Sequence, residues 1–596
     1  MEEKYYSNER TVQIVLYLLK AYGIKKVIAS PGTTNLTVVG SMQQDKWFEM
    51  YSSWDERSAA YMACGMAAES GEPVVLTCTG ATASRNYMPG LTEAYYRKLP
   101  VIALTSTQDQ SRIGQLAEQV IDRTQQPKDL VVCSEQLQFI ENATDEWAVT
   151  VKVNRAMHAL IKNGGGPIHL NIETHYSSDF SVKTLPEARV IKYYDTNTTL
   201  PDMPKGSVGI FIGSHLPMNK QLTATIDKFC ATYGAVVFCS HVSNYKGPYA
   251  VRNTIVCLQD DYQSTLFQYD LLINIGEVTG GDWQFGRIRS KQQWRVNPDG
   301  QIRDLFHGLT AVFAMPEQAF FEYYASRNTK DNSVSAEELT NPFSKEYSSV
   351  IDNFPEVGFS NIWIAKQAAH RLPEGSELHL GILNSLRCWN FFQVPDSVNV
   401  MANTGGFGID GVVSSLIGAS LANPNRLYFG VVGDLAFFYD LNSLGNRHVG
   451  SNVRVLLVNN GRGVEFRNPY HPCYPFGEAA DPYMAAAWHY GNQSHDLIRH
   501  YASDLGYEYL SASTKDEFNE VIDKFLNPEI TDKSIIFEVF PTVKDEQDAL
   551  WAAHHILSDP ELIKRRKMLV KKNKRKAMIK SVLPNGVIAM MKKIKH

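Results

Sequence analysis

Residues 429–463 read FGVVGDLAFFYDLNSLGNRHVGSNVRVLLVNNGRG, and this stretch decides the fold. One apolar run ends at Gly433 and Asp434, a second ends at Asn459 and Asn460, and FFYDLNSLGN between them predicts a helix. Two strands joined through a helix form a parallel pair, so both strand ends reach one crevice. Carboxylate, amide and backbone carbonyl oxygens at such ends suit Mg²⁺. The glycines that follow permit close approach of the backbone to a diphosphate.

The same alternation of strands and helices extends in both directions. Runs such as KKVIAS, EPVVLTCTG, LPVIALTST, SVGIFIGSH, AVVFCSH and SIIFEVF predict buried strands, and TVQIVLYLLKAYGI predicts an amphipathic helix. We therefore predict an α/β protein with three successive doubly wound parallel-sheet domains. The expected ranges are 1–185, 186–350 and 351–555, with a basic tail at 556–596, and the polar segment 328–350 is expected to be a linker.

Composition narrows the class of protein. The 596 residues are 44% hydrophobic and 20% charged, which is typical of a globular chain. No apolar run reaches the length of about 20 residues that a spanning helix needs. The acidic start, MEEKYYSNER, does not fit a secretory signal. Eight cysteines occur without a C-x-x-C pair, so neither a zinc site nor a disulfide framework is indicated, and a reducing cytoplasm is expected.

The stretch WDERSAAYMACGMAAESG, residues 54–71, predicts a helix built from small residues. Asp55 is a good N-cap, because its carboxylate can accept from the first free backbone N–H groups. Glu56 in the first turn suits the positive end of the helix dipole. Capping alone would explain both acids, unless other motifs give Glu56 a second role.

Those motifs exist. The spaced G-D and N-N pairs, together with IASPGTTN, GILNSLR and NTGGFGIDGVVSSLIGAS, resemble the thiamine diphosphate-dependent enzymes. The resemblance is greatest to the 2-succinyl-5-enolpyruvyl-6-hydroxy-3-cyclohexene-1-carboxylate synthases of menaquinone synthesis (the menaquinone-pathway synthases). It runs in collinear order from about residue 10 to 550. It implies pyrimidine, central and diphosphate domains, with thiamine diphosphate and Mg²⁺ as cofactors.

The resemblance also implies roles for individual residues. Glu56 would hydrogen-bond the aminopyrimidine ring nitrogen, and Gln119 would lie near the reacting carbon. Asp434, Asn460 and the carbonyl of Arg462 would ligate the metal. Ile409, with Phe407 as the alternative, would be the apolar wedge that bends the cofactor. The remaining cofactor-binding positions implied are Gly433, Leu435, Gly463 and Val464.

The substrate positions depart from the menaquinone-pathway synthases. Arginine is replaced at four family motif positions, by Thr34, Gln108, Trp389 and Thr404. Since guanidinium groups bind carboxylates bidentately, a less anionic partner is expected. Trp389 is expected either to stack on a ring or to pack in the core. Ser385 is expected either to meet a substrate carboxylate or to cap the next helix.

Two other features belong to this substrate side. Arg387 and Arg462 are candidates for restoring one carboxylate contact, and the loop 465–483 is a candidate lid over the site. The function implied is decarboxylation of a 2-oxo acid, with carboligation to an unknown acceptor. The alternatives are a menaquinone-pathway synthase with a divergent pocket and an inactive scaffold on the same fold.

The last expectations concern partners. In the family the glutamate and the diphosphate domain usually come from different subunits, which implies a homodimer or homotetramer. Residues 564–596 carry 13 Lys and Arg and no acid, and the remaining 45 bases face 63 acids, a net charge of −18. Nucleic acid is therefore not expected. The tail is expected either to bind an anionic membrane surface at the inner face or to be a solvated segment. Its composition suggests surface-polysaccharide or unusual-sugar synthesis.

Overall fold

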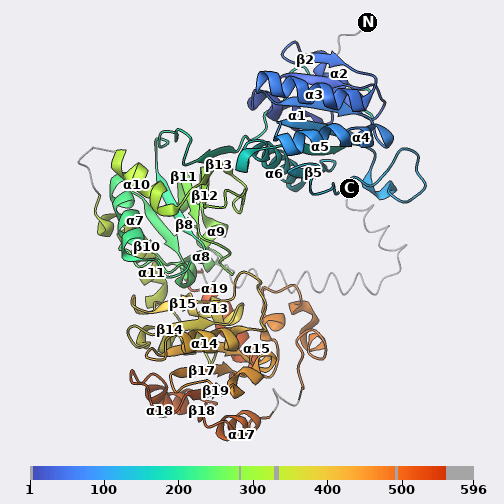
Figure 1. The fold of residues 1–596 in the computed structure, drawn as a ribbon. Helices are drawn as coiled ribbons and strands as arrows, with labels where there is room; N and C mark the ends of the chain where they lie inside the picture. The colour runs from blue at the N-terminus through green and yellow to red at the C-terminus, as the bar shows by residue number, and fades with distance from the viewer. Residues whose placement is uncertain (1–4, 281–283, 328–333, 490–493, 559–596) are drawn as a thin grey trace, which may run out of the picture. The chain divides into compact units, whose positions relative to one another are not determined.

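The computed structural model describes most of the chain (Figure 1). The described residues are 5–280, 284–327, 334–489 and 494–558. The basic tail predicted at 556–596 therefore lies almost wholly outside the described residues. The chain divides into two compact units. The first unit comprises Met1–Asp202 and Gln292–Pro316, and the second comprises Met203–Lys291 and Glu317–His596.

The first unit contains a sheet of six described strands in the order β2-β1-β3-β4-β6-β5, with every neighbouring pair parallel. The strands are β1 (Lys26–Ala29), β2 (Glu49–Ser52), β3 (Val74–Cys78), β4 (Val101–Thr107), β5 (Cys133–Leu137) and β6 (Ile168–Glu173). The helices between them are α1 (Arg10–Ala21), α2 (Leu36–Met42), α3 (Glu56–Ser70), α4 (Thr82–Asn86), α5 (Met88–Arg97) and α6 (Ala143–Ala159).

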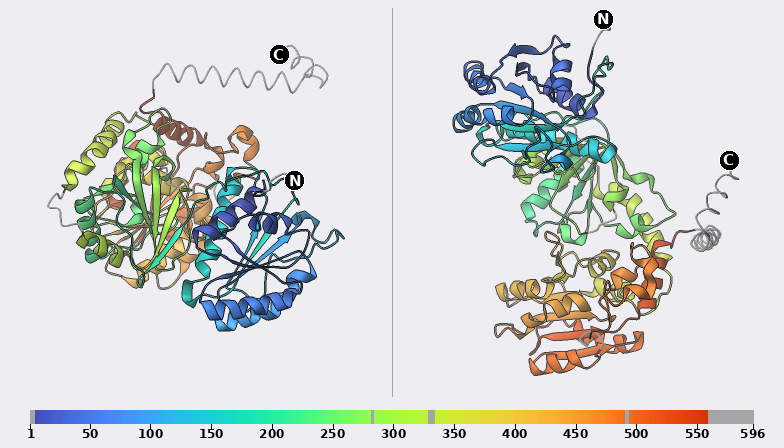
Figure 2. Two further views of the ribbon diagram at one scale, coloured as in Figure 1. Left: turned by 90° about the horizontal axis from the view of Figure 1, so that it is seen from above. Right: turned by 90° about the vertical axis from the view of Figure 1, so that its right-hand side faces the viewer.

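Both faces of this sheet are covered by helices, as Figure 2 shows. The apolar stripes of α1 and α6 form one core with strand residues such as Val75 and Leu104. The small residues of α3 and the apolar residues of α5 form a second core with Leu76 and Cys78. Coverage on both faces explains why the strands are nearly continuous apolar runs. The first unit also holds β7 (Lys192–Asp195), β13 (Leu309–Ala314) and most of β12 (Arg289–Val296).

In the second unit, four parallel strands in the order β10-β9-β8-β11 form part of the second sheet. They are β8 (Val208–Ile212), β9 (Val236–Cys239), β10 (Ala250–Val251) and β11 (Gln268–Ile275). The accompanying helices are α7 (Lys220–Tyr233), α8 (Thr254–Leu258), α9 (Gln284–Arg287), α10 (Glu317–Arg327) and α11 (Ala336–Asp352). The expected linker is thus wrong over most of its length. Ser335 caps α11 by accepting from the N–H of Glu338, and the helix buries Phe343 and Val350.

The third sheet has six described strands in the order β15-β14-β16-β17-β19-β18, again all parallel. The strands are β14 (Glu377–Leu380), β15 (Asn399–Met401), β16 (Tyr428–Gly433), β17 (Val453–Val458), β18 (Glu508–Ala512) and β19 (Ile535–Val539). The helices are α12 (Asn361–Ala368), α13 (Asn384–Trp389), α14 (Val412–Ala422), α15 (Asp434–Tyr439), α17 (Leu497–Asp504), α18 (Lys515–Phe525) and α19 (Val543–His554).

The first and third sheets have the same strand order, because adding 13 to each strand number of the first gives the third. The order reverses between β1 and β3 and between β14 and β16, and ligands bind at such reversals, beyond the carboxyl ends of the strands. The predicted α/β class with three parallel sheets is confirmed. The domain boundaries stay predictions, although each sheet lies within one of the three predicted ranges.

Two local findings complete the fold. The helix predicted over FFYDLNSLGN is shorter than expected: α15 begins at Asp434 itself and ends at Tyr439, and a 3₁₀ helix follows over Leu441–Gly445. Among the described helices, none is long and apolar enough to cross a membrane.

Candidate active site

The sharpest feature of the third sheet is the carboxyl end of β16. Asp434 follows the strand directly and is only 2% exposed. Its Oδ1 accepts from the backbone N–H of Leu435 at 2.8 Å, whereas its Oδ2 is buried without a hydrogen-bond partner. Burial raises the pKa of Asp434 to about 7, although the backbone N–H groups of Gly461 and Arg462 favour the ionised form. A buried carboxylate oxygen without a partner is the kind of atom that a bound cation satisfies.

The neighbouring strand β17 supplies a second such oxygen. The Oδ1 of Asn460 is buried without a hydrogen-bond partner. Asn459 differs, because its Nδ2 donates to Oε1 of Glu538 at 2.7 Å and its backbone N–H donates to Val539. Only one asparagine of the pair is therefore available to a ligand. Two oxygens without partners, from a carboxylate and an amide, fit a hard divalent cation. Within the described residues, no group of three or more His, Cys, Asp or Glu side chains is arranged to hold a metal ion.

The turn after Asn460 lies against the start of α15. A Cβ added to Gly463 would lie 3.1 Å from Cδ1 of Leu435. Gly461 has a φ of 77°, in the left-handed region that favours glycine. The predicted cofactor positions Gly433, Leu435, Gly463 and Val464 thus belong to one corner of this sheet, formed by the ends of β16 and β17.

The arginines next to this corner are engaged in ion pairs. Nη1 of Arg462 lies 2.5 Å from Oδ2 of Asp481, and Nη1 of Arg467 lies 2.7 Å from Oδ1 of the same carboxylate. Arg387 pairs with Glu465. Each arginine therefore already has an acidic partner, and the carboxylate contact predicted for Arg387 or Arg462 stays a prediction. The predicted use of the Arg462 carbonyl as a metal ligand is unaffected and stays a prediction.

The loop that follows, residues 465–483, is anchored by the ion pairs of Asp481 with Arg462 and Arg467. Asp481 is buried, and the backbone N–H of Gly463 donates to the carbonyl of Ala485 at 2.6 Å. The loop contains two short 3₁₀ segments, Val464–Arg467 and Tyr474–Ala480. It carries exposed aromatic side chains, of which Tyr483 is 93% exposed. The lid role predicted for 465–483 stays a prediction, and its base is fixed by ion pairs.

Residues after β14 and β15 were expected to meet the substrate. Trp389 is 1% exposed, and its Nε1 donates to Oδ1 of Asn361 at 3.2 Å. Of the two roles predicted for it, the structure has core packing, because a fully buried ring cannot stack on a ligand. Thr404 is also buried, and its hydroxyl donates to Oγ of Ser214 at 3.2 Å. Ser385 is buried in α13, which begins after the positive-φ residue Leu383.

The two candidates for the apolar wedge differ in environment. Ile409 is partly buried against the core formed by α14, β16 and β17. Phe407 is 38% exposed and has a φ of 54°. The structure places Ile409 against a rigid wall and Phe407 on an exposed turn, and the choice between them stays open.

In the first unit, Glu56 is the first residue of α3 and is half-buried. Asp55 caps the helix as predicted, because its Oδ1 accepts from the backbone N–H of Arg57 and its Oδ2 accepts from the hydroxyl of Ser58. This division of labour leaves the Glu56 carboxylate with one weak contact, at 3.5 Å from Nδ2 of Asn86. The cofactor role predicted for Glu56 stays a prediction.

The other predicted residues of this unit, Thr34, Gln108 and Gln119, lie in the segments that follow β1 and β4. Thr34 is buried, and its hydroxyl contacts Oγ1 of Thr79 at 2.8 Å and the carbonyl of Ser106 at 3.2 Å. Gln108 follows β4, and its Oε1 accepts from Nη1 of Arg112 at 2.5 Å. Gln119 is exposed, with a φ of 60°. Thr34 therefore ties strand ends together instead of presenting a free polar group.

Comparison with known proteins decides the family. Residues 9–126 match the family described as "Thiamine pyrophosphate enzyme, N-terminal TPP binding domain". These residues therefore match the N-terminal cofactor-binding domain of thiamine diphosphate-dependent enzymes. The predicted family and thiamine diphosphate as its cofactor are confirmed.

Several curated relatives align with this thiamine diphosphate enzyme over nearly its whole length, and all are named 2-succinyl-5-enolpyruvyl-6-hydroxy-3-cyclohexene-1-carboxylate synthase. The protein from Bacteroides thetaiotaomicron is 29% identical over 577 residues, which cover 93% of this chain and 99% of the relative. The protein from Bacteroides fragilis is 28% identical, and the alignment covers 93% of this chain and 100% of the relative. The thiamine diphosphate-dependent 4-hydroxybenzoylformate decarboxylase of Rhodococcus jostii RHA1 aligns over 89% and 99%, with a TM-score of 0.38 and 17% identity.

Two residues near these positions were not predicted from the sequence. Asp481 holds Arg462 and Arg467, and the only signal for it was its place in a loop rich in Pro and aromatics. Arg123 is a buried arginine beside the end of β4, and its position after Gln119 gave no signal of burial.

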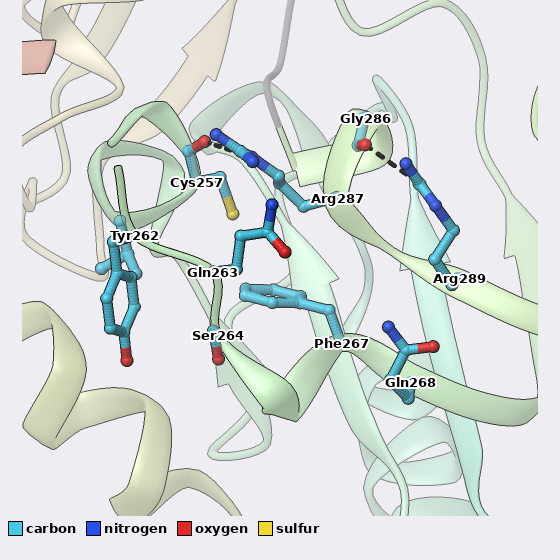
Figure 3. A pocket seen from close by; sticks show the side chains of 10 residues that line it. Cys257, Tyr262, Gln263, Ser264, Phe267, Gln268, Gly286, Arg287 and Arg289 are labelled. Carbon is cyan, nitrogen blue, oxygen red and sulfur yellow. Dashed lines mark hydrogen bonds between the residues drawn. The ribbon is translucent and has the colours of Figure 1, made fainter. Parts of the chain in front are cut away.

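A cavity of about 400 Å³ in the second unit contains none of the predicted site residues (Figure 3). Arg287 lies in its wall and donates through Nε to the carbonyl of Cys257 and through Nη2 to that of Gln259. Figure 3 shows Arg289 turned toward the carbonyl of Gly286. Both guanidinium groups therefore donate to backbone carbonyls. No ligand is assigned to this cavity.

Proposed function

We propose that the chain uses thiamine diphosphate with Mg²⁺ to decarboxylate a 2-oxo acid and to transfer the resulting acyl carbanion to an acceptor. One observation carries the proposal: Oδ2 of Asp434 and Oδ1 of Asn460 are buried without partners at the ends of adjacent parallel strands. Such a pair fits Mg²⁺, whose remaining ligands are commonly phosphate oxygens. The confirmed family supplies the second support.

The chain's own residues would divide the work as follows. Asp434 and Asn460, with the carbonyl of Arg462, would hold the cation, and Gly461 and Gly463 would let the backbone approach the diphosphate. When bound, thiamine diphosphate supplies a nucleophilic carbon and an electron sink. Glu56 would hold a proton at the aminopyrimidine ring nitrogen, and Gln119 would orient the reacting group. Asp481 would keep Arg462 in place through its ion pair.

The substrate side distinguishes this proposal from the activity in the relatives' names. Thr34, Gln108, Trp389 and Thr404 are neutral, and Trp389 is in the core. Each bidentate charge contact that is absent costs about 1.5–3 kcal/mol of binding. The resemblance to the menaquinone-pathway synthases implies 2-oxoglutarate and isochorismate as their substrates, and a pair with fewer carboxylates therefore suits this chain better.

The first test is calorimetric titration of the metal-free protein with thiamine diphosphate and Mg²⁺. We expect saturable binding in the wild type, loss of binding in Asp434→Ala, and near-normal binding in Glu56→Gln, because Glu56 acts after the cofactor is held. CO₂ release from a panel of 2-oxo acids then identifies the donor, and Glu56→Gln should lose it. Absence of binding in the wild type would favour the inactive scaffold.

The menaquinone-pathway reaction is the second candidate, because relatives with that name are 28–29% identical over 93% of the chain. Incubation with 2-oxoglutarate and isochorismate, with product detection by mass spectrometry, separates the two. Turnover at the rate of an authentic synthase would favour the second candidate. A role in surface-polysaccharide or unusual-sugar synthesis rests on tail composition alone, and it stays a prediction.

A further inference from the structure

Arg123 is a buried cation that the fold does not satisfy. Its side chain belongs to a residue only 2% exposed, and its Nη2 donates to the carbonyl of Ser106 at 2.9 Å. Its Nε and Nη1 are buried without a hydrogen-bond partner. Burial lowers the pKa of Arg123 to about 10, so the guanidinium is still charged at neutral pH. A buried charge in this state costs several kcal/mol unless an anion compensates it.

Another buried arginine shows how this protein satisfies a purely structural guanidinium. Arg454 is fully buried, and both of its terminal nitrogens donate to two acceptors each, whereas its Nε, like that of Arg123, has no partner. The acceptors are the carbonyls of Ser451, Glu529 and Lys533 and the hydroxyl of Thr531. Arg123 has one acceptor in place of four. The contrast indicates that Arg123 is arranged for a group that is not part of the described chain.

The charges around Arg123 point to an anion. Its electrostatic neighbours are Cys78 and Tyr176, which are neutral at pH 7 because burial raises the pKa of each, and Arg85, which repels it. Within the described residues no carboxylate forms an ion pair with Arg123. The missing partner is therefore negatively charged.

The position of Arg123 is the ligand-binding end of the first sheet. A Cβ on Gly80, just after β3, would lie 2.9 Å from the carbonyl of Gln119 and 3.9 Å from Nη2 of Arg123. The backbone N–H of Gly80 also donates to the hydroxyl oxygen of Thr34 at 3.1 Å. The strand order reverses next to this point, between β1 and β3. Gln119 and Leu116, on the segment beside Arg123, both have positive φ, and Leu116 is fully exposed.

We propose that Arg123 binds a carboxylate of the substrate at the carboxyl ends of β3 and β4. This inference deepens the proposed function and rests on it, since it names the group that selects an anionic 2-oxo acid. Arg123 takes over the work of the two arginines that the family motifs place at Thr34 and Gln108. Those two neutral side chains are already held by Thr79 and Arg112.

The test uses the full chain with thiamine diphosphate and Mg²⁺, and compares the wild type with Arg123→Met and Arg123→Lys. Arg155→Gln is the matched control, because Arg155 lies in the same unit and is paired with Glu135. The probes are pyruvate, 2-oxobutyrate and 2-oxoglutarate, with pyruvamide as the uncharged analogue and inorganic phosphate at equal ionic strength. Thermal midpoint and calorimetric affinity are measured for each.

We expect at least one 2-oxo acid to raise the thermal midpoint of the wild type and of Arg155→Gln. In Arg123→Met its affinity should fall about 10- to 100-fold, the range for a hydrogen bond to a charged group. Arg123→Lys should be intermediate, because it keeps the charge but loses the planar fork. Without any ligand, Arg123→Met should be as stable as the wild type or more stable, because an uncompensated charge is removed.

Three results would overturn the inference. A lower midpoint of Arg123→Met with unchanged 2-oxo acid affinity would make Arg123 a structural cation. Equal stabilisation by phosphate or by pyruvamide would mean that no carboxylate is recognised. If no 2-oxo acid changes the thermal midpoint of the wild type, Arg123 has no substrate carboxylate to bind. Thiamine diphosphate binding is titrated in the same samples, so a failure of the proposed function is seen separately, as a wild type that does not bind the cofactor.

Discussion

At the scale of single residues, the site is recognised by atoms that lack partners. Asn459 and Asn460 are adjacent residues of the same type. The side chain of Asn459 donates to Glu538, whereas Oδ1 of Asn460 has no hydrogen-bond partner. The same reasoning separates Arg123 from Arg454. A fold satisfies most of its buried polar groups, so a partnerless carboxylate, amide or guanidinium atom at the carboxyl end of a strand is a candidate for contact with a ligand.

Glu546 gives a prediction about pH at this scale. Its carboxyl is buried and accepts from the backbone N–H of Asn361 at 3.1 Å, and burial raises its pKa to about 7. The folded protein therefore holds this proton more tightly than the unfolded chain. Glu546 adds stability at low pH that is lost as the pH rises from about 4.5 toward 7.

The variant Glu546→Gln keeps the acceptor and removes the titration. At pH 8 we expect the variant to have a higher thermal midpoint than the wild type, with a free energy of unfolding larger by up to about 3 kcal/mol. At pH 5 the two proteins should have the same thermal midpoint. Melting curves at both pH values check this. A difference of equal size at pH 5 and pH 8 would show that the carboxyl is ionised in both conditions.

At the scale of elements, the site depends on helices that approach closely. Gly90 in α5 faces Ala60 in α3, and a Cβ on Gly90 would lie 2.4 Å from that of Ala60. Small residues at this crossing fix the position of α3, whose first residue is Glu56. The small-residue composition of α3 thus has a packing reason that is independent of the capping by Asp55.

Gly90→Ala should therefore separate the two helices and cost about 1–3 kcal/mol of stability. Ala60→Gly alone should cost about 1 kcal/mol through helix propensity. Because the two changes relieve each other, the double variant should lose less than the sum of the single losses. Thermal or urea unfolding of all four proteins measures this coupling. Strictly additive losses would mean that α3 and α5 do not constrain each other.

At the scale of the whole molecule, the predicted site residues are divided between two units of the chain. Glu56 and Arg123 belong to the first unit, and Asp434 and Asn460 belong to the second. Exposed apolar side chains on and next to α3, including Trp54, Tyr61 and Met62, suit the subunit contacts that the predicted homodimer or homotetramer requires. The oligomeric state stays a prediction.

The basic tail gives a prediction at this scale. The full chain should co-sediment with vesicles that contain phosphatidylserine, and a chain ending at residue 558 should not, because 13 bases are removed. Binding should weaken as salt is added, since the attraction is screened. Vesicles of phosphatidylcholine alone are the control. Both chains should bind thiamine diphosphate equally, and vesicle binding by the shortened chain would contradict the prediction.

The sequence by itself determined the class of fold and predicted the corner at Asp434 and Asn460, because apolar runs ending in polar residues are local patterns and parallel strands bring such ends together. The cofactor family followed from the resemblance of its motifs to those of known enzymes. The sequence also predicted the cap at Asp55 correctly. It could not find the helix α11, because polar residues hid its two buried side chains.

Only the tertiary structure decided which of those polar groups are free. Trp389 packs in the core, Arg387 and Arg462 pair with Glu465 and Asp481, and Arg123 is left buried without an anion. Each of these outcomes depends on a partner distant in sequence, or on the lack of one. Burial and pairing arise from the packing of whole elements, and no local pattern of residues encodes them.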